Sequence, residues 1–548
     1  AFVKKYVRPV ILQQKADAQA VNFSGIFGSR MNADMMQKTQ QTGAGKYAIT
    51  TSAGGASVLG KGLAKGIMNA EKNAKELKSK DQIRALASGR QLAAGAITSL
   101  RDAAKIDSNI ALSGYMAEQK RRAEQVSIVM DGAGEYACTT LSYVKNNKIE
   151  NIKKFNLPHS LGHFYSSVTG FLGFKMLEDE YKVMGLSSYG EPTYVNWIEK
   201  NILISNNESY YINNNILDYH SAFKNKFSSS LIKKFGSQRQ KNQKITKLHK
   251  DIANSAQKAF ENVLIKLAKF LKNKTKANNL IISGGCGLNC TANGVISDLN
   301  IFDKVFIPPA PHDAGAALGS AFMALSQNTN ISFINKVKFS PYLGPSYSNK
   351  EIHKCLISKS VKFVQVEDLN KFLNIAVDEI IKEKVICWFQ GASEFGPRAL
   401  GNRSFLADPR DDKIVSTMNQ KIKQREEFRP FAPSIKSESY NDYFISKSAN
   451  EFMTVITNVK PNIIDKIPAV VHIDKTARPQ IVYKDNNEIY WSLINAFEQK
   501  TNIPLLLNTS FNIQEPIVNS PDEAIDTFLK SNVKKLFINK FVVYKDEF

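Results

Sequence analysis

A dense group of cations lies in residues 394–433, which read EFGPRALGNRSFLADPR and, after ten intervening residues, KIKQREEFRPFAP. A basic run is ordinarily a solvated charged face, but here the cations alternate with glycine, proline and phenylalanine instead of helix formers. Guanidinium forks and an ammonium on loops suit a polyanion such as a nucleoside triphosphate or an acyl phosphate. The sequence therefore predicts an anion-binding site, with these cations as candidates: Arg398, Arg403, Arg410, Lys421, Lys423, Arg425 and Arg429.

Two buried strands are expected to position this site. Residues 385–389, VICWF, form an apolar run that breaks at Gln390-Gly391 just before the cations. Residues 504–507, PLLL, lead into Asn508-Thr-Ser510-Phe-Asn512, where a hydroxyl and amides can bind phosphate or an amide-bearing substrate. We include Arg429, Arg478 and Asn508 with Ser510 and Asn512 as expected substrate or nucleotide contacts.

In the preceding part of the chain, glycines and carboxylates also follow directly after predicted strands. Residues 126–130, VSIVM, predict a strand that ends at Asp131-Gly-Ala-Gly, and residues 279–283, NLIIS, predict another that ends at Gly284-Gly285. A glycine pair after a buried strand lets backbone N–H groups approach a phosphate, and Asn289 follows closely, although a purely structural turn is the alternative. Asp313 opens an Ala/Gly-rich helix, as a metal-binding carboxylate or as a plain N-cap.

The net charge of +23 is unevenly distributed. Residues 1–125 contain 20 Lys and Arg against 9 Asp and Glu, a surplus of +11, and the other residues have a surplus of +12. A basic protein invites a nucleic-acid partner, but no zinc finger, RNP-type strand or KH-type GXXG element is present, so we expect none. No apolar run reaches the ~20 residues of a membrane span. Five scattered cysteines favour reduced thiols and a cytoplasmic location.

Composition divides the chain into three parts. Residues 1–125 are a basic Ala/Gly/Lys-rich segment, expected to be mainly helical or flexible, with a weak apolar stripe at 81–124 typical of an assembly helix. Residues 126–340 and 345–548 are expected to be two α/β domains separated by the Pro/Gly/Ser cluster at 339–347. Within the first, residues 251–271 predict an amphipathic helix, and the Asn/Lys-rich residues 200–249 are interpreted as a variable, solvated insertion.

From residue 126 to the C-terminus the chain resembles the O-carbamoyltransferases, which carbamoylate nodulation factors and several antibiotics. The likeness rests on the motifs quoted above, on FNLPHSLG at 155–162 and on EYKVMGL at 180–186. Lys423-x-Arg425 with Ser510 and Asn512 also matches the K-x-R…S-x-N signature of YrdC-like domains. The resemblance implies an actin-like ATPase (ASKHA-type) domain at 126–340 followed by a YrdC-like domain at 345–548.

The resemblance further implies how the site works. The second domain would form carbamoyl-adenylate from carbamoyl phosphate and ATP, and the first would transfer the carbamoyl group to a small-molecule hydroxyl acceptor, expected to be a sugar. A divalent metal, Fe or Mg, would sit on Asp131 and Asp313, beside the glycine pair Gly284 and Gly285. A homo-oligomer is compatible with this scheme. The expected catalytic residues are Lys423, Arg425, Arg398 and Arg403.

Residues 1–125 depart from the family pattern, because they contain no histidine where the family places an H-x-x-H metal motif. Two explanations stay open: the N-terminal subdomain was replaced, or the sequence joins two unrelated pieces. A second function class therefore stays open as well. The chain would then be a fusion or assembly protein whose basic N-terminus docks to a larger partner, with a partly or wholly inactive carbamoyltransferase-like region.

Overall fold

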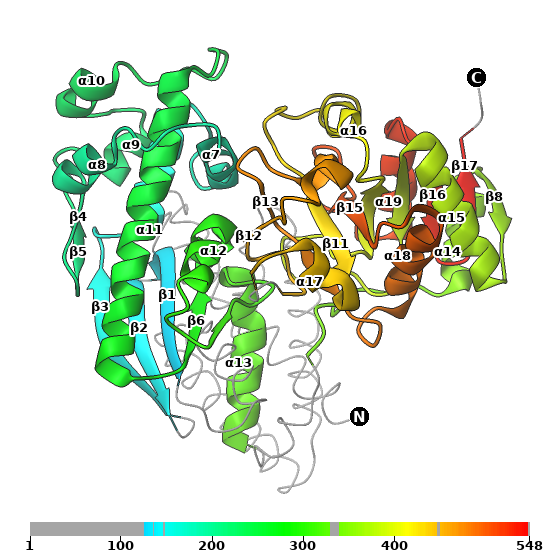
Figure 1. The fold of residues 1–548 in the computed structure, drawn as a ribbon, viewed down its shortest axis with the longest axis horizontal. Coiled ribbons are helices and arrows are strands. Elements are labelled where there is room, and N and C mark those ends of the chain that lie inside the picture. Colours follow the sequence, from blue (N-terminus) through cyan, green and yellow to red (C-terminus); the bar gives the residue numbers. More distant parts are fainter. Residues whose placement is uncertain (1–124, 135, 146–147, 329–338, 447–449, 546–548) are drawn as a thin grey trace, which may run out of the picture. The chain divides into compact units, whose positions relative to one another are not determined.

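The computed structural model describes residues 125–134, 136–145, 148–328, 339–446 and 450–545. The predictions for residues 1–124, including the assembly helix and the docking role, lie outside these residues. The described residues at 125–319 and from 339 onward belong to one compact unit. Within it the chain is mixed α/β and forms a five-stranded and an eight-stranded sheet, as the sequence predicts in outline (Figure 1).

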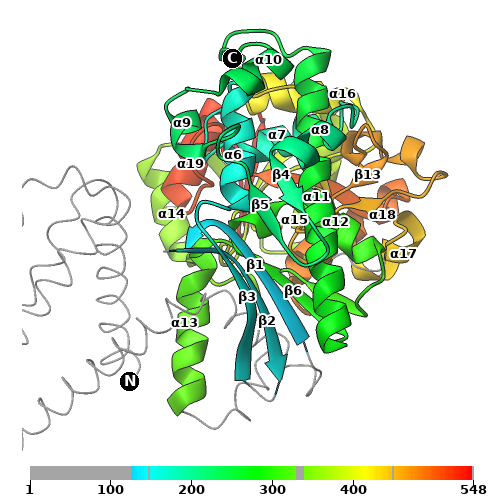
Figure 2. The same ribbon diagram turned by 90° about the vertical axis from the view of Figure 1, so that its left-hand side faces the viewer.

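The first sheet has the strand order β3-β2-β1-β6-β7. Its first three strands are antiparallel neighbours, whereas β1 pairs parallel with β6, and β6 with β7 (Figure 2). The predicted strands at 126–130 and 279–283 are therefore adjacent, so Asp131 and Gly284 leave the sheet from neighbouring strands. The strands are β1 (Gln125–Gly134), β2 (Ala137–Lys145), β3 (Lys148–Asn156), β6 (Asn279–Ser283) and β7 (Lys304–Phe306).

Helices pack the first sheet into a core of its own. The predicted amphipathic helix is present as α11 (Lys247–Thr275), where the apolar face including Ile252, Phe260 and Leu267 is buried. The helices that accompany it are α6 (Leu161–Phe171), α7 (Glu180–Ser187), α12 (Cys290–Asp298) and α13 (Asp313–Asn328). No helix in the described part of the chain combines the length and apolar composition needed to cross a bilayer.

The interpretation of residues 200–249 as a solvated insertion is wrong in one respect, because much of it is folded. Its elements are β4 (Leu203–Ser205), β5 (Tyr210–Ile212), α9 (Tyr219–Phe223) and α10 (Ser229–Phe235), after α8 (Val195–Asn201). Sparse apolar residues such as Leu203 and Phe235 join the first core. The buried Arg239 guanidinium then donates to the carbonyl oxygens of Leu172 and Gln243 and ties the segment to the end of α6.

The second sheet has the order β14-β11-β15-β10-β9-β16-β17-β8. The predicted strands at 385–389 and 504–507 are β9 and β15, and β10 lies between them. Helices α14 (Asn349–Ser358), α15 (Leu369–Glu383), α18 (Glu488–Thr501) and α19 (Pro521–Lys530) accompany it. The strands are β8 (Lys362–Gln365), β9 (Val385–Phe389), β10 (Arg403–Ala407), β11 (Ala432–Lys436), β14 (Gln480–Val482), β15 (Leu505–Ser510), β16 (Lys535–Ile538) and β17 (Phe541–Tyr544).

Candidate functional site

A cavity of about 670 Å³ contains residues from both sheet-bearing parts of the compact unit. Asp131, Gly285 and Asn289 line it from the first part, and arginines line it from the second. Many of the predicted site residues thus line one cavity, although they come from segments up to several hundred residues apart. The predicted residues that line the cavity are Asp131, Gly285, Asn289, Arg398, Arg425, Arg429, Arg478, Asn508, Ser510 and Asn512.

The loop between β9 and β10 carries Arg398 to the cavity. Glu394 organises this loop, because one of its carboxylate oxygens accepts from the backbone N–H groups of Leu400, Asn402 and Arg403 at 2.7, 2.8 and 3.1 Å. Gly396 has a φ of +120°, and a Cβ there would lie 2.5 Å from the carbonyl oxygen of Pro309. A glycine is therefore required for the loop to pack against the segment that precedes Asp313.

Lys423 connects the two halves of the K-x-R…S-x-N signature. It follows the π-helical turn η5 (Met418–Ile422), and its Nζ donates to the carbonyl oxygens of Ser510 and Asn512, both at 2.7 Å. The same nitrogen lies 3.1 Å from Ser510 Oγ and 2.6 Å from Asn512 Oδ1. Burial, and then the neighbouring Arg425, lower the pKa of Lys423 well below its ordinary value. Lys423 does not line the cavity itself, but it fixes two residues that do.

Four arginines crowd together in the cavity wall: Arg398, Arg425, Arg429 and Arg478. Burial, followed by Arg478, lowers the pKa of Arg398 to about 9, and burial with Arg429 does the same to Arg425. Among the described residues, Arg425 Nη2 and Arg478 Nε are buried without a hydrogen-bond partner. Mutual repulsion and unused donors are both relieved by a bound anion. The cluster is thus built to receive phosphoryl or carboxyl oxygens.

Arg403 has a different role from the one expected of it. It is fully buried at the start of β10, and its guanidinium donates to the carbonyl oxygens of Gln390, Asn402, Pro345 and Gly391 at 2.7 to 3.1 Å. The group also stacks over the Phe389 ring, 3.6 Å from its centroid. Arg403 does not line the cavity, and its Nη1 and Nη2 donors are used by the chain, while its buried Nε has no partner among the described residues. Its geometry is that of a structural residue.

Asp131 and the glycine pair meet at the ends of β1 and β6. Asp131 accepts from Gly132 N at 2.6 Å and from Gly285 N at 2.7 Å. Gly284 has a φ of +83°, and a Cβ there would lie 2.0 Å from Met130 O, so the close packing requires glycine. Burial, and then the Asp313 carboxylate, raise the pKa of Asp131 to about 6.

The fit of a divalent metal to this corner is incomplete. Asp131 and Asp313 interact electrostatically, and two carboxylates are suitable oxygen ligands for Mg²⁺ or Fe²⁺. Within the described ranges, however, three or more His, Cys, Asp or Glu residues never gather as a metal-binding group. His159 Nδ1 accepts from Ile212 N at 3.2 Å and is already used. These residues do not complete a metal site.

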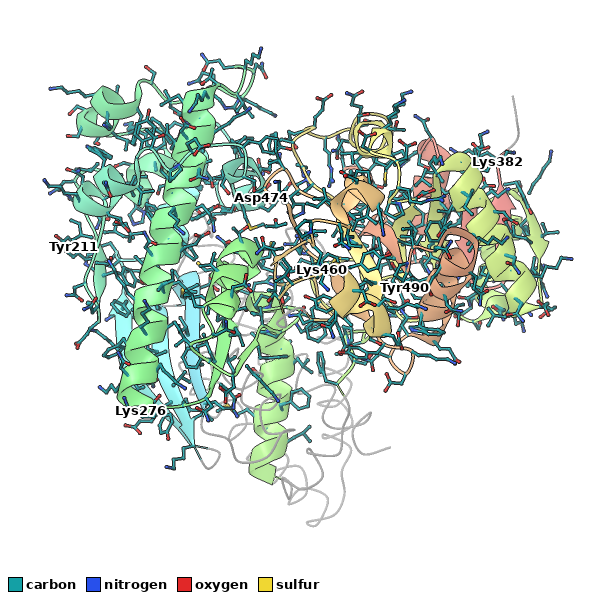
Figure 3. All side chains as sticks on the ribbon, viewed as in Figure 1. Tyr211, Lys276, Lys382, Lys460, Asp474 and Tyr490 are labelled. Atoms are coloured by element: carbon teal, nitrogen blue, oxygen red, sulfur yellow. The ribbon has the colours of Figure 1, made fainter. Side chains whose placement is uncertain are left out.

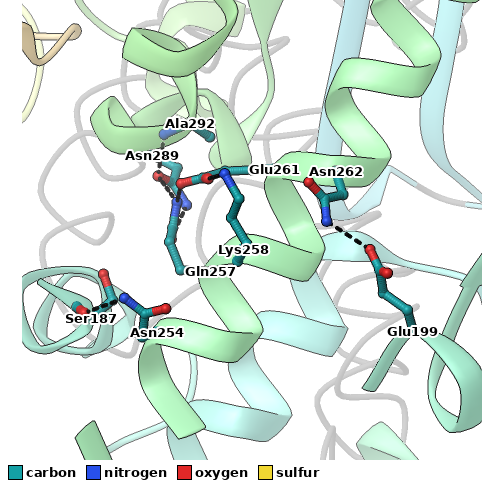
Figure 4. Close-up of polar contacts among 9 residues, drawn as sticks. All are labelled: Ser187, Glu199, Asn254, Gln257, Lys258, Glu261, Asn262, Asn289 and Ala292. Carbon is teal, nitrogen blue, oxygen red and sulfur yellow. Dashed lines mark hydrogen bonds and ion pairs between the residues drawn. The ribbon is translucent and has the colours of Figure 1, made fainter. Parts of the chain in front are cut away.

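Asn289 lines the cavity, but its amide is engaged by α11 (Figure 4). Its Oδ1 accepts from Gln257 Nε2 at 3.0 Å and from Ala292 N at 3.0 Å, and its Nδ2 donates to Gln257 Oε1 at 2.9 Å. Asn508 differs, because its Nδ2 donates to Ala399 O, Ser434 Oγ and Gln480 Oε1 while its buried Oδ1 has no partner among the described residues. Asn508 therefore retains an acceptor in the cavity wall.

Several cavity residues in the turn before Arg478 were not predicted from the sequence. His472 Nδ1 lies 3.0 Å from Thr476 Oγ1, and that hydroxyl donates to Asp474 Oδ1 at 2.6 Å (Asp474 is labelled in Figure 3). All three line the cavity. Burial lowers the pKa of His472 to about 4, with Arg478 acting in the same direction and Asp474 against it. The sequence offers one indication of these residues, because His472 and Asp474 are two residues apart and shortly precede Arg478.

Comparison with known proteins identifies relatives of the chain. The family model described as carbamoyltransferase N-terminus matches residues 76–322, and the model described as carbamoyltransferase C-terminus matches residues 377–545. The first match begins inside the segment 1–125 that the sequence analysis placed outside the family. The curated relatives reported below align over 77% of the chain, about the extent predicted from the motifs.

An uncharacterized protein of Synechocystis is 36% identical, and the match covers 73% of its length. Nodulation protein NolO of Bradyrhizobium diazoefficiens is 34% identical with 76% covered, and nodulation protein NolNO of Sinorhizobium fredii is 35% identical with 61% covered. A crystal structure of full-length HypF with phosphate and nucleotide aligns with a TM-score of 0.22 and 16% identity over 31% of this chain and 21% of that chain, too little to support a fold argument. On the family models and the relatives together, the chain belongs to the carbamoyltransferase family.

Proposed function

We propose that this carbamoyltransferase activates carbamoyl phosphate with ATP in the arginine-lined cavity and transfers the carbamoyl group to a hydroxyl of a sugar. The observation that carries the proposal is the group of four cavity arginines, two of which have buried donors without a partner among the described residues, because two phosphorylated substrates must be held together there. The two domains proposed for these steps are residues 126–340 for transfer and residues 345–548 for activation. The strand order β3-β2-β1-β6-β7 is compatible with an actin-like transfer domain.

In the proposed activation, carbamoyl phosphate and water first give carbamate and inorganic phosphate. A carbamate oxygen then attacks the α-phosphorus of ATP, and pyrophosphate leaves. Arg398, Arg425 and Arg478 would neutralise the phosphoryl oxygens and the charge that develops on them, and Arg429 would bind carbamoyl phosphate before the reaction. Ser510 and Asn512, held by Lys423, would bind a phosphate oxygen or the carbamoyl amide.

In the proposed transfer, the acceptor hydroxyl oxygen attacks the carbamoyl carbon and AMP leaves. This step belongs to the end of the cavity near Asp131, whose raised pKa suits a group that takes up a proton near neutral pH. Because the described residues do not complete a metal site beside Asp131, we expect transfer to be less efficient than activation.

One reaction mixture tests both steps. The protein is incubated with carbamoyl phosphate, ATP and an excess of a candidate sugar, and AMP and carbamoylated sugar are measured by mass spectrometry. We expect AMP formation that depends on carbamoyl phosphate and exceeds carbamoylated product, because an unconsumed adenylate is hydrolysed. Equal yields would show that the transfer site is complete. Absence of carbamoyl-phosphate-dependent AMP would contradict the proposed function.

A further inference from the structure

A lysine outside the cavity, Lys182, is placed to influence the position of the cavity residue Arg429. Lys182 lies in α7 of the first part of the unit and does not line the cavity. Its Nζ lies 2.8 Å from Glu426 Oε1 and 3.0 Å from Asp179 Oδ1. Glu426 lies in the basic stretch of the second part, so this ion pair connects the two parts next to Arg429.

Glu426 is shared between two cations. Its other oxygen, Oε2, lies 3.7 Å from Arg429 Nη1, beyond the 2.7–2.9 Å typical of a charge-assisted hydrogen bond. Arg429 is instead supported by the Tyr181 ring, whose centroid lies 4.6 Å from the guanidinium carbon. Arg429 thus remains available to the cavity, although a carboxylate stands close to it.

We infer that Lys182 is a positioning residue for Arg429. By pairing with Glu426 Oε1, Lys182 prevents that carboxylate from capturing Arg429 in a bidentate pair. Only about a third of the Glu426 side chain is exposed, so without Lys182 its charge would be poorly solvated and would turn to the nearest cation. A Cβ added at Gly185 would lie 3.6 Å from Pro430 Cδ, so α7 packs closely on the same segment.

This inference rests on the proposed use of the cavity for carbamoyl phosphate and ATP. It predicts that Lys182→Met weakens binding of the phosphorylated substrates, because Arg429 is withdrawn, while the chemical step is little changed. We expect KM for carbamoyl phosphate to rise about tenfold, equivalent to the loss of one charge-assisted contact, with kcat within about twofold of the wild type. Lys182→Arg should retain the wild-type KM.

The decisive variant is the double substitution. In Lys182→Met/Glu426→Gln, the neutral amide cannot capture Arg429, so KM should return to within about twofold of the wild type. Lys500→Met is the matched control, because it removes a lysine from a 2.6 Å pair with Asp378 that does not border the cavity. All variants are assayed for pyrophosphate release at varied carbamoyl phosphate and saturating ATP.

The outcomes separate this inference from the proposed function. A wild-type protein without carbamoyl-phosphate-dependent pyrophosphate release would overturn the proposed function. An active wild type with an unchanged KM in Lys182→Met, or a raised KM that Glu426→Gln fails to restore, would overturn the positioning role alone. Loss of kcat without a change of KM would do the same, because a positioning effect on substrate binding must appear in KM.

Discussion

Lys423 Nζ lies 2.6 Å from Asn512 Oδ1, although 89 residues separate them in the chain. The lysine donates as well to the Asn512 and Ser510 carbonyl oxygens, so its three protons are directed at the turn that follows β15. The signature residues therefore act as one unit, in which a buried ammonium holds the two polar residues that face the cavity.

Replacing this lysine should disable activation. We expect Lys423→Met to reduce carbamoyl-phosphate-dependent pyrophosphate release by about 10²–10³, the usual effect of disturbing a preorganised electrostatic site. Lys421→Met, two residues earlier on an exposed position, is the control and should be nearly wild type. Pyrophosphate release at the wild-type rate in Lys423→Met would show that the signature is not part of the site.

Arg403 should affect stability more than chemistry. Arg403→Met removes the donors of four backbone carbonyl groups and is expected to lower the free energy of unfolding by about 2–4 kcal/mol. The measurement is urea denaturation, with Lys500→Met as an exposed ion-pair control expected to cost under about 1 kcal/mol. An unchanged denaturation midpoint in Arg403→Met would contradict the structural role.

His472 should make the protein sensitive to acid. Its pKa in the folded state is about 4, below the ordinary value of 6.5, so folding opposes its protonation. The linked stability is complete above about pH 6.5 and is lost as the pH falls through 4, by up to about 3 kcal/mol. His163, whose pKa burial also lowers to about 4, contributes in the same direction.

The test is the pH dependence of unfolding. The free energy of unfolding is measured between pH 7.5 and 4.5 in the wild type and in His472→Gln. The variant should lose markedly less stability over this range, since His472 no longer titrates. Parallel curves would mean that His472 is protonated as readily in the folded as in the unfolded chain.

Metal binding should be weak and should depend on Asp131. The described residues provide two carboxylates, of which Asp131 already accepts two backbone hydrogen bonds. We expect purified protein to retain less than one equivalent of Fe or Mg by elemental analysis, and Asp131→Asn to retain none. A tightly bound stoichiometric metal that survives Asp131→Asn would place the metal site elsewhere in the chain.

The sequence predicted the framework of the site because the framework follows from local pattern. The apolar runs at 126–130, 279–283 and 385–389 are strands, and the polar ends of the first two meet because β1 pairs with β6. The resemblance to the K-x-R…S-x-N signature associated Lys423 with Ser510 and Asn512, and Lys423 contacts both residues.

Side-chain direction was not predictable in the same way. Arg398 and Arg403 are five residues apart in one basic stretch, yet Arg398 faces the cavity and Arg403 binds carbonyl groups of its own loop. Which way each points depends on the turn that Glu394 organises through three backbone N–H groups. The contacts of Lys182 with Glu426 join segments over 240 residues apart, and no local pattern indicates them.

We propose that the arginine cavity forms an adenylate from carbamoyl phosphate. The most direct measurement is pyrophosphate release from ATP with and without carbamoyl phosphate, in the wild type and in Arg478→Ala. The account predicts release only when carbamoyl phosphate is present, and a fall of about 10²–10³ in Arg478→Ala without loss of folding stability, because the substitution relieves repulsion with Arg398. Release that is independent of carbamoyl phosphate, or unaffected by Arg478→Ala, would contradict it.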